Sequence, residues 1–429
     1  MPSMVRTLRT RSGLTGRAWT FVGLGAGLVL IGMWQDLVPA VQFGALLALL
    51  PVAAGMLTRA PSSRLELQRT LSAKELSSGD ELTVTVGIRG RFPRGRGLLL
   101  EDLASPALGG AHRFALSGMT GQGIRRPHYR VRVGARGLHH LGPMRIHLVD
   151  RFGMIHRVVT VGGRDEVLVA PRVVPLDPLV LSAAVSGAGS GHLGTPGQAA
   201  DDVIPRDYRP GDEVRRIDWK ASARTGGLMV RSEERPWRSA VTVVLDLHNA
   251  DHRGVEPESS ADVALSLAAS IGTVALEQGW DLTVLSTDDR LLFAGSPITG
   301  LDQERRALLW SLATVPLSHA SVPSSTLGTT SDTAASGPVV MVLGSVAPPS
   351  ARILSGVGPH SPLRLLVSIA SEQWAGPDRR PEHGAGPATA LLPAHEEAMT
   401  VFRGSGWHTT TLERDAGVAA AWSALGGPR

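Results

Sequence analysis

The chain has 429 residues, which is enough for two or three domains of ordinary size. Its 43% hydrophobic and 19% charged residues are typical of a globular protein, and the lack of cysteine excludes disulfides, a thiolate nucleophile and cysteine-ligated metal centres. The net charge is +5, but no block of basic residues occurs and aromatic residues make up only 4%, so we expect no nucleic-acid binding.

Two uncharged apolar stretches near the start predict a transmembrane helical hairpin. They cover residues 18–34 and 37–57, with Asp36 between them, and at 1.5 Å per residue they reach roughly 25–30 Å, close to the thickness of the hydrocarbon core. A signal peptide would leave the second stretch unexplained. Arginines flank the hairpin on both sides, namely Arg6, Arg9, Arg11 and Arg17 before it and Arg59, Arg64 and Arg69 after it. By the positive-inside rule, residues 1–60 anchor the chain in the lipid of the cell membrane as a two-helix, multi-pass segment with both termini in the cytoplasm.

The region 61–175 has the period of two that β-strands show. Apolar and polar residues alternate over 65–68, 82–86 and 129–133, and turn residues separate these runs. Short strands at this spacing predict an all-β sandwich of immunoglobulin-like or fibronectin-like type. The stretch 176–200 is rich in Ser, Gly and Ala and predicts a flexible linker.

From residue 237 to 429 the pattern changes to strands that alternate with helices. Residues 241–245 are a continuous apolar run that ends at Asp246, which is typical of a parallel strand buried on both faces. Beyond it, helical spacing over 259–277 and 303–313 alternates with strand-like runs over 282–285, 339–343 and 363–369. This order predicts a doubly wound α/β domain.

The segment 201–236 between these regions carries the most specific motif. Its residues 209–212, Arg-Pro-Gly-Asp, predict a turn in which Pro presets φ and Gly supplies a positive φ. Asp212 can cap a helix that starts there and that Gly226-Gly227 ends, and residues 228–231 are expected to form a strand.

This segment resembles the signature of the bacterial "domain of unknown function 58" family. Members show an Arg-x-Tyr-x-Pro-Gly-Asp turn, then Arg-x-Ile-x-Trp, then Ser-Ala-Arg before a strand with acidic residues. The matching residues are Arg206, Tyr208, Pro210, Gly211, Asp212, Arg215, Ile217, Trp219, Ser222, Ala223, Arg224 and Glu233. The resemblance covers essentially the whole chain and implies a membrane hairpin, a β-rich domain and an α/β domain similar to von Willebrand factor type A domains.

Similarity to von Willebrand factor A domains marks a degenerate metal-site position. Such domains often bind a divalent cation through Asp-x-Ser-x-Ser at the end of the first strand, and here Asp246, His248 and Ala250 take these positions. Mg²⁺ prefers oxygen ligands, which the side chains of His248 and Ala250 do not offer. We therefore expect no metal and no other cofactor, with a divalent cation at this position as the less favoured alternative.

The family resemblance implies a non-enzymatic, membrane-tethered interaction or scaffold protein. It would work beside a MoxR-type AAA+ ATPase in the assembly or remodelling of protein complexes, because the chain has no Walker A sequence of its own. The alternative is a metal-dependent hydrolase that uses Asp207, Asp212 and Asp218, although capping and ion pairing also account for these residues. The sequence leaves the oligomeric state open.

Overall fold

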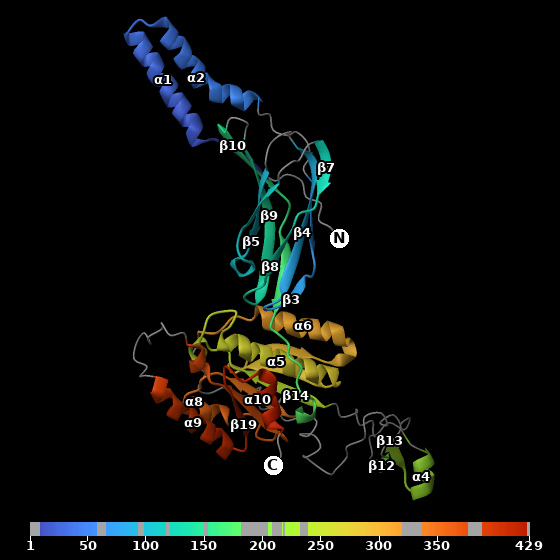
Figure 1. The fold of residues 1–429 in the computed structure, drawn as a ribbon. Helices are drawn as coiled ribbons and strands as arrows, with labels where there is room; N and C mark the ends of the chain where they lie inside the picture. The colour runs from blue at the N-terminus through green and yellow to red at the C-terminus, as the bar shows by residue number, and fades with distance from the viewer. Residues whose placement is uncertain are drawn as a thin grey trace. The chain divides into compact units, whose positions relative to one another are not determined.

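The computed structural model describes residues 9–57, 66–92, 98–116, 121–149, 153–181, 205–207, 217, 219–231, 239–319, 337–375 and 388–426. The chain divides into two compact units, residues 1–172 and residues 173–429, with the division close to the predicted end of the β-rich domain at residue 175. We describe each unit by itself (Figure 1). Short 3-10 helices occur as η1 (Pro106–Leu108), η3 (Asn249–Asp251), η4 (Pro297–Thr299) and η6 (Ser371–Trp374).

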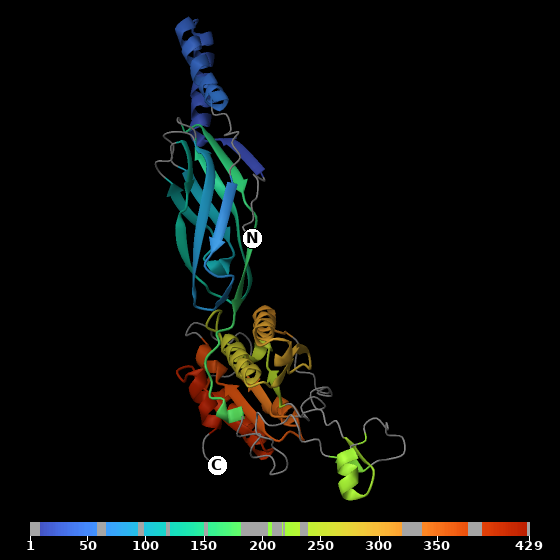
Figure 2. The ribbon, with the colours of Figure 1, turned by 90° about the vertical axis from the view of Figure 1, so that its right-hand side faces the viewer.

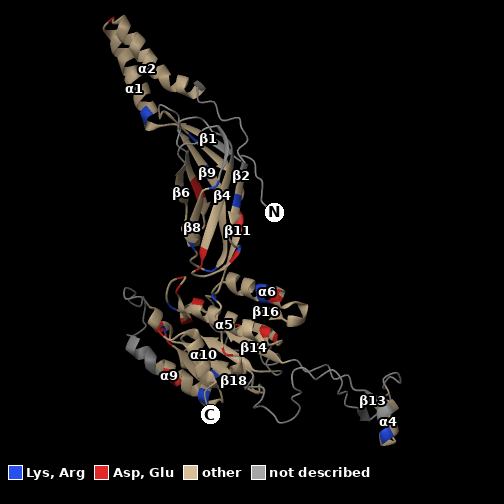
Figure 3. Cartoon of the chain, turned by 45° about the vertical axis from the view of Figure 1, so that its right-hand side comes forward, with Lys and Arg blue, Asp and Glu red and all other residues tan. Residues whose placement is uncertain are grey.

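Two apolar helices begin the first unit, α1 (Gly16–Trp34) and α2 (Val38–Leu57). Both are long and apolar enough to cross a membrane, and only 17% of each apolar window is buried in the structure. Figure 3 shows that neither helix carries a charged residue after the first turn of α1. A third helix of suitable length and hydropathy, α5 (Ser260–Glu277), is 78% buried and is therefore a core helix of its own unit. The hairpin is consistent with membrane anchoring.

The β-rich part of the first unit consists of two sheets. One contains β2 (Glu66–Leu71), β4 (Glu81–Phe92), β7 (Gly121–Arg125) and β8 (His128–Arg132). The other contains β1 (Arg9–Leu14), β3 (Glu75–Ser77), β5 (Leu98–Ala104), β6 (His112–Leu116), β9 (Gly137–Val149), β10 (Ile155–Val161) and β11 (Asp165–Ala170). Alternate residues of both sheets, such as Leu82, Val84 and Ile146, pack in one shared core. The prediction that this region forms a β-rich domain is confirmed. Its immunoglobulin-like or fibronectin-like type is not established by the strands alone.

Strand β1 precedes the apolar hairpin but belongs to the same sheet as the chain that follows it. It pairs antiparallel with β10, so that Leu14 lies opposite Ile155. Immediately afterwards Thr15 caps α1, and its hydroxyl donates a hydrogen bond of 2.6 Å to the carbonyl of Gly153. Ile155 also packs with Ala18 of α1 and Ala54 of α2. The segments on either side of the hairpin are therefore held together at one end of the sheet.

The second unit is a six-stranded sheet with helices on both faces, as Figures 1 and 2 show. Its strands, in sheet order, are β16 (Leu291–Gly295), β15 (Asp281–Ser286), β14 (Ala240–Leu245), β17 (Val339–Leu343), β18 (Arg364–Ile369) and β19 (His408–Leu412), and all pairs except β15–β16 are parallel. One face is covered by α5, α6 (Leu301–Thr314) and α10 (Val418–Leu425), the other by α8 (Pro348–Leu354) and α9 (Ala388–Gly404). Neighbouring residues of β14 face opposite cores, Val243 one and Val244 the other.

The start of the predicted linker is part of this second core. Leu176, Val180 and Leu181 are buried against it, and the indole N–H of Trp422 donates to the carbonyl of Asp177 at 2.9 Å. Residues 173–181 therefore belong to the α/β unit, while residues 182–200 lie outside the described part of the chain.

Candidate functional site

The described part of the family signature is a small strand–helix–strand arrangement. Strand β12 (Pro205–Asp207) pairs antiparallel with β13 (Met229–Arg231), and Arg206 lies opposite Val230. Helix α4 covers Trp219–Thr225, and Ile217 just before it is buried in a β-bridge, so the expected helix does not run unbroken to Gly226; its predicted start at Asp212 lies outside the described residues. A β-branched residue such as Ile217 favours extended backbone over helix more than the Ala-rich α4 sequence does.

Within the signature, Ser222 has a clear structural role. Its hydroxyl oxygen accepts the backbone N–H of Met229 at 2.8 Å and so ties α4 to β13. Trp219 is 67% exposed, and Ala223 and Arg224 are exposed on α4. Tyr208, Pro210, Gly211, Asp212, Arg215 and Glu233 lie outside the described residues. So do Asp212 and Asp218 of the hypothetical acidic cluster, and Asp207 is described only in its backbone, as part of β12.

The best-defined polar site lies at the carboxyl end of β14. Asp246 directly follows the strand and is only 2% exposed. Its Oδ1 accepts the backbone N–H of His248 at 3.0 Å, and its Oδ2 accepts the N–H of Gly344 at 3.2 Å, just beyond the end of β17. A Cβ at Gly344 would lie 2.2 Å from the carbonyl oxygen of Asp251, so only glycine allows this close approach. One carboxylate thus links the loops after two neighbouring strands.

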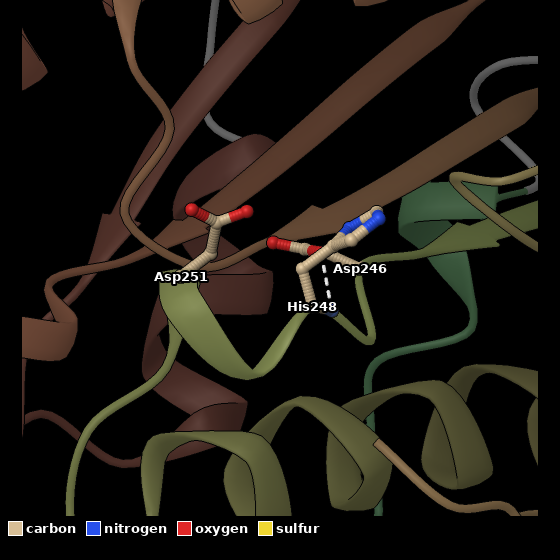
Figure 4. Close-up of side chains that lie close together, drawn as sticks. All are labelled: Asp246, His248 and Asp251. Atoms are coloured by element: carbon tan, nitrogen blue, oxygen red, sulfur yellow. Dashed lines mark hydrogen bonds and ion pairs between the residues drawn. The ribbon is translucent and has the colours of Figure 1, made fainter. Parts of the chain in front are cut away.

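His248 lies against this carboxylate. Its Nδ1 is 2.9 Å from Asp246 Oδ1 and 3.2 Å from the hydroxyl of Thr287, which follows β15 (Figure 4). The imidazole is 3% exposed, and its Nε2 is buried without a hydrogen-bond partner in the structure. The hydrogen bond to Asp246 raises the pKa of His248. Burial alone would raise the pKa of Asp246, but the bond from His248 and the charge of His252 hold it below its usual value.

A second carboxylate, that of Asp251 in η3, shares the site. Burial, together with the charge of Asp246, raises the pKa of Asp251 to about 7. Behind it, His252 is fixed by its Nε2 against the carbonyl of Asp246 at 3.1 Å and by its Nδ1 against the Ser260 hydroxyl at 3.2 Å. Ser260 begins α5, whose N-cap Ser259 forms a capping box with Asp262. The first turn of a long core helix therefore fixes the loop that carries the site.

Among the described residues, Asp246, His248 and Asp251 are a group whose potential ligand atoms lie within 4.8 Å of one another. They do not fit a hard divalent cation as they lie. The carboxylate of Asp246 stands between Asp251 and the His248 ring, which is directed away from Asp251 (Figure 4). An ionised carboxylate only accepts hydrogen bonds, so the 2.9 Å contact requires a proton on Nδ1, and this nitrogen cannot bind a metal held by Asp246. The other ring nitrogen, Nε2, belongs to the ring that is directed away from Asp251, so it does not converge with the two carboxylates on one ion (Figure 4). Ala250 adds no oxygen donor.

Sequence reasoning identified Asp246 and His248 but missed Asp251, Thr287 and Gly344. A signal was present, because Thr287 and Gly344 directly follow parallel strands, and Asp251 lies in the loop after a third, β14. The carboxyl ends of parallel strands meet at one edge of a sheet, so residues there converge even when they are far apart in the chain.

These features define a class of protein: an α/β domain with a buried aspartate–histidine pair at the carboxyl edge of its sheet, preceded in the chain by a β-rich domain and an apolar hairpin. Residues 205–346 match the family model "Protein of unknown function DUF58". The resemblance drawn from the signature is thereby confirmed.

Two bacterial relatives are similar to this chain. The chain is 24% identical over 276 residues to "Uncharacterized protein YeaD" of Bacillus subtilis, a match that covers 62% of this chain and 64% of the relative. It is 30% identical over 132 residues to "Uncharacterized protein Rv1480" of Mycobacterium tuberculosis, covering 30% and 41% of the two chains. The chain thus spans less than two thirds of the length of either relative. A solved structure, Northeast Structural Genomics Consortium target SoR45, matches 25% of this chain and 87% of its own at 8% identity, with a TM-score of 0.17 that carries no structural argument.

Proposed function

We propose that this protein is a non-enzymatic, membrane-tethered interaction or scaffold protein whose α/β domain binds its partner at the carboxyl edge of the sheet. The observation that carries this proposal is the position of Asp246. Strand β14 comes first in the chain but lies inside the sheet. The chain continues on one side of it as β15 and later returns to its other side as β17. In open α/β sheets, ligands bind where the strand order reverses in this way. Asp246 joins β14 to the end of β17 at this point.

The chemistry of the site favours binding over catalysis. Among the described residues of this site, two hydroxyls lie against a histidine: that of Thr287, buried beside His248, and that of Ser260, beside His252. Ser260 is fully buried, and its oxygen also accepts the N–H of Arg253 at 2.9 Å. A nucleophile must reach its substrate, so this pair serves to hold the loop. Asp251, which is partly exposed, offers charge and hydrogen bonds to a partner, and the buried Asp246 and His248 hold the loop that carries it.

The apolar hairpin would hold this domain at the membrane. Pairing of β1 with β10 places the segments before α1 and after α2 in one sheet, which supports two membrane crossings with both flanks on the same side. The arginines on these flanks favour the cytoplasmic side, so both termini and the α/β domain would face the cytoplasm.

The proposed partner is a MoxR-type AAA+ ATPase, as the family resemblance implies. The ATPase would supply nucleotide hydrolysis, and the scaffold would position it at the membrane for the assembly or remodelling of protein complexes. A partner with its own fold suits this end of the sheet, where the strand-end loops are already fixed, because pre-ordered loops lose little conformational freedom on binding.

The experiment is affinity purification of tagged full-length protein from native membranes under conditions that trap ATP, with bound proteins identified by mass spectrometry. We expect enrichment of a MoxR-type ATPase with the wild type and at least a tenfold reduction with Asp246→Asn. Glu277→Gln is the matched control, because Glu277 is exposed at the far end of α5. Absence of the ATPase from the captured proteins would contradict the proposed partner. Equal capture by a folded Asp246→Asn variant would contradict the proposal that the partner binds at this edge of the sheet.

A further inference from the structure

A hard divalent cation beside Asp246 would need further oxygen ligands, and the side chains of His248 and Ala250, which follow it in the same loop, offer none. Instead of leaving a gap, His248 turns its ring onto the carboxylate: Oδ1 of Asp246 receives both the Nδ1–H and the backbone N–H of His248, at 2.9 and 3.0 Å. Oδ2 receives the N–H of Gly344 at 3.2 Å. Three donors therefore surround the carboxylate.

These contacts perform the two tasks of a bound cation. A cation would stabilise the buried charge of Asp246, and here the Nδ1–H of His248 and the backbone N–H groups of His248 and Gly344 do so through hydrogen bonds. A cation would also tie together the loops that supply its ligands. Here Asp246 joins the end of β17, and His248 reaches both Thr287 after β15 and, through a backbone bridge, Ser318.

We propose that His248 is a built-in substitute for a divalent cation, so that this edge of the sheet is assembled without a metal ion. Where the inference extends to partner binding it rests on the function proposed above: the partner would dock without a metal bridge. The role of His248 within this chain is tested without any partner.

The first test is metal binding by the full-length wild type in detergent. Mn²⁺ is titrated by calorimetry, and thermal unfolding is compared in excess EDTA and in excess Mn²⁺. We expect no saturable binding and the same Tm in both conditions. Saturable binding of Mn²⁺ that disappears in Asp246→Asn but persists in Glu277→Gln would overturn the inference, because the carboxylate would then hold a metal despite His248.

The second test restores the oxygen donors. In the double variant His248→Ser/Ala250→Ser, Asp246 is followed by hydroxyls at both positions, and we expect saturable Mn²⁺ binding. Its Tm should rise by several degrees when Mn²⁺ exceeds its Kd about 100-fold. Ala250→Ser alone is the matched control: Ala250 is exposed, His248 stays in place, and no Mn²⁺ should bind.

A double variant that folds in EDTA and binds no Mn²⁺ would overturn the inference, as would Mn²⁺ binding by Ala250→Ser alone. If the double variant is unfolded in EDTA, circular dichroism on addition of Mn²⁺ decides: recovery of the folded signal supports the substitution of His248 for a cation, and no recovery counts against it. Failure to capture an ATPase leaves these outcomes unchanged, so the two proposals can fail separately.

Discussion

Each unit of the chain buries a charged cluster, and the two clusters differ in how completely their groups are paired. In the β-rich domain, the guanidinium of Arg69 lies 2.6 Å from Asp102 and also forms an ion pair with Asp165. Asp102 is fully buried and additionally accepts the hydroxyl of Tyr129 at 2.7 Å. Arg69 donates further to the carbonyl of Leu141. The guanidinium of Arg69 and the oxygens around it therefore satisfy one another's charge and hydrogen-bonding capacity.

The cluster in the α/β domain is incomplete by comparison. Asp246 is well bonded, but His248 Nε2 is buried without a partner, and Asp251 has a pKa raised to about 7. Unpaired polar groups and shifted pKa values are costly, and in native proteins they gather at functional sites. Burial of charge alone therefore does not indicate function: the fully paired cluster stabilises a fold, and the incompletely paired one marks a site.

The largest effect is expected when the complete cluster is broken. Arg69→Met would leave the carboxylate of Asp102 buried without its cation and should lower the free energy of unfolding of the β-rich domain by about 3–5 kcal/mol. Hydrogen exchange of β4 and β9 measures this loss. Arg130→Met is the matched control, because Arg130 is 67% exposed and lies 3.8 Å from an exposed Glu81, a pair of little energetic value. Equal losses of unfolding free energy in the two variants would contradict the expectation that the buried ion pair stabilises the domain more than the exposed one.

A smaller effect is expected from breaking the pair in the α/β domain. Asp246→Asn removes the charged acceptor of His248 and should cost about 1.5–3 kcal/mol. Because the hydrogen bond to Asp246 raises the pKa of His248, that pKa should fall in the variant, as measured by NMR titration of the imidazole. An unchanged imidazole titration would show that the two side chains are not coupled.

Local patterns were sufficient to predict the α/β domain closely. The apolar run that ends at Asp246 became β14, and the strand expected over residues 339–343 is β17 without change. Such strands are buried on both faces, so nearly every residue is apolar and the strand is visible in the sequence as a near-continuous apolar run. The pattern also located Asp246, because a charge that directly follows a buried strand can only lie at its carboxyl end.

What the sequence did not reveal depends on distant contacts. Strand β1 is short and arginine-rich, and it becomes a strand only because β10, far along the chain, offers its backbone edge. The approach of Gly344 to Asp251 likewise depends on how β17 packs beside β14. In the signature, local propensity favoured a helix from Asp212, yet Ile217 is in a β-bridge.

The third prediction concerns pH. An unfolded aspartate titrates near 3.9 and folded Asp251 at about 7, so the folded domain binds more protons between these values. The contribution of Asp251 to stability is therefore greatest below about pH 4 and is lost as the pH rises to about 7. Asp251→Asn should remove this decline and raise the free energy of unfolding by about 1–2 kcal/mol at pH 8. Chemical denaturation of wild type and variant at pH 5 and pH 8 measures this change in the free energy of unfolding. A variant that is less stable than the wild type at pH 8 would contradict the prediction.

The smallest effects come from removing one hydroxyl from each cluster. Tyr129→Phe deletes the 2.7 Å bond to Asp102, a fully buried carboxylate, and should cost about 1 kcal/mol. Thr287→Val deletes the contact at 3.2 Å to His248 Nδ1, but that nitrogen keeps its shorter bond to Asp246, so the cost should stay below about 0.5 kcal/mol. Chemical denaturation followed by hydrogen exchange in each domain separates the two values. A larger loss in Thr287→Val than in Tyr129→Phe would reverse the comparison, because it would mean that the α/β cluster depends on every one of its contacts and that the β-rich cluster does not.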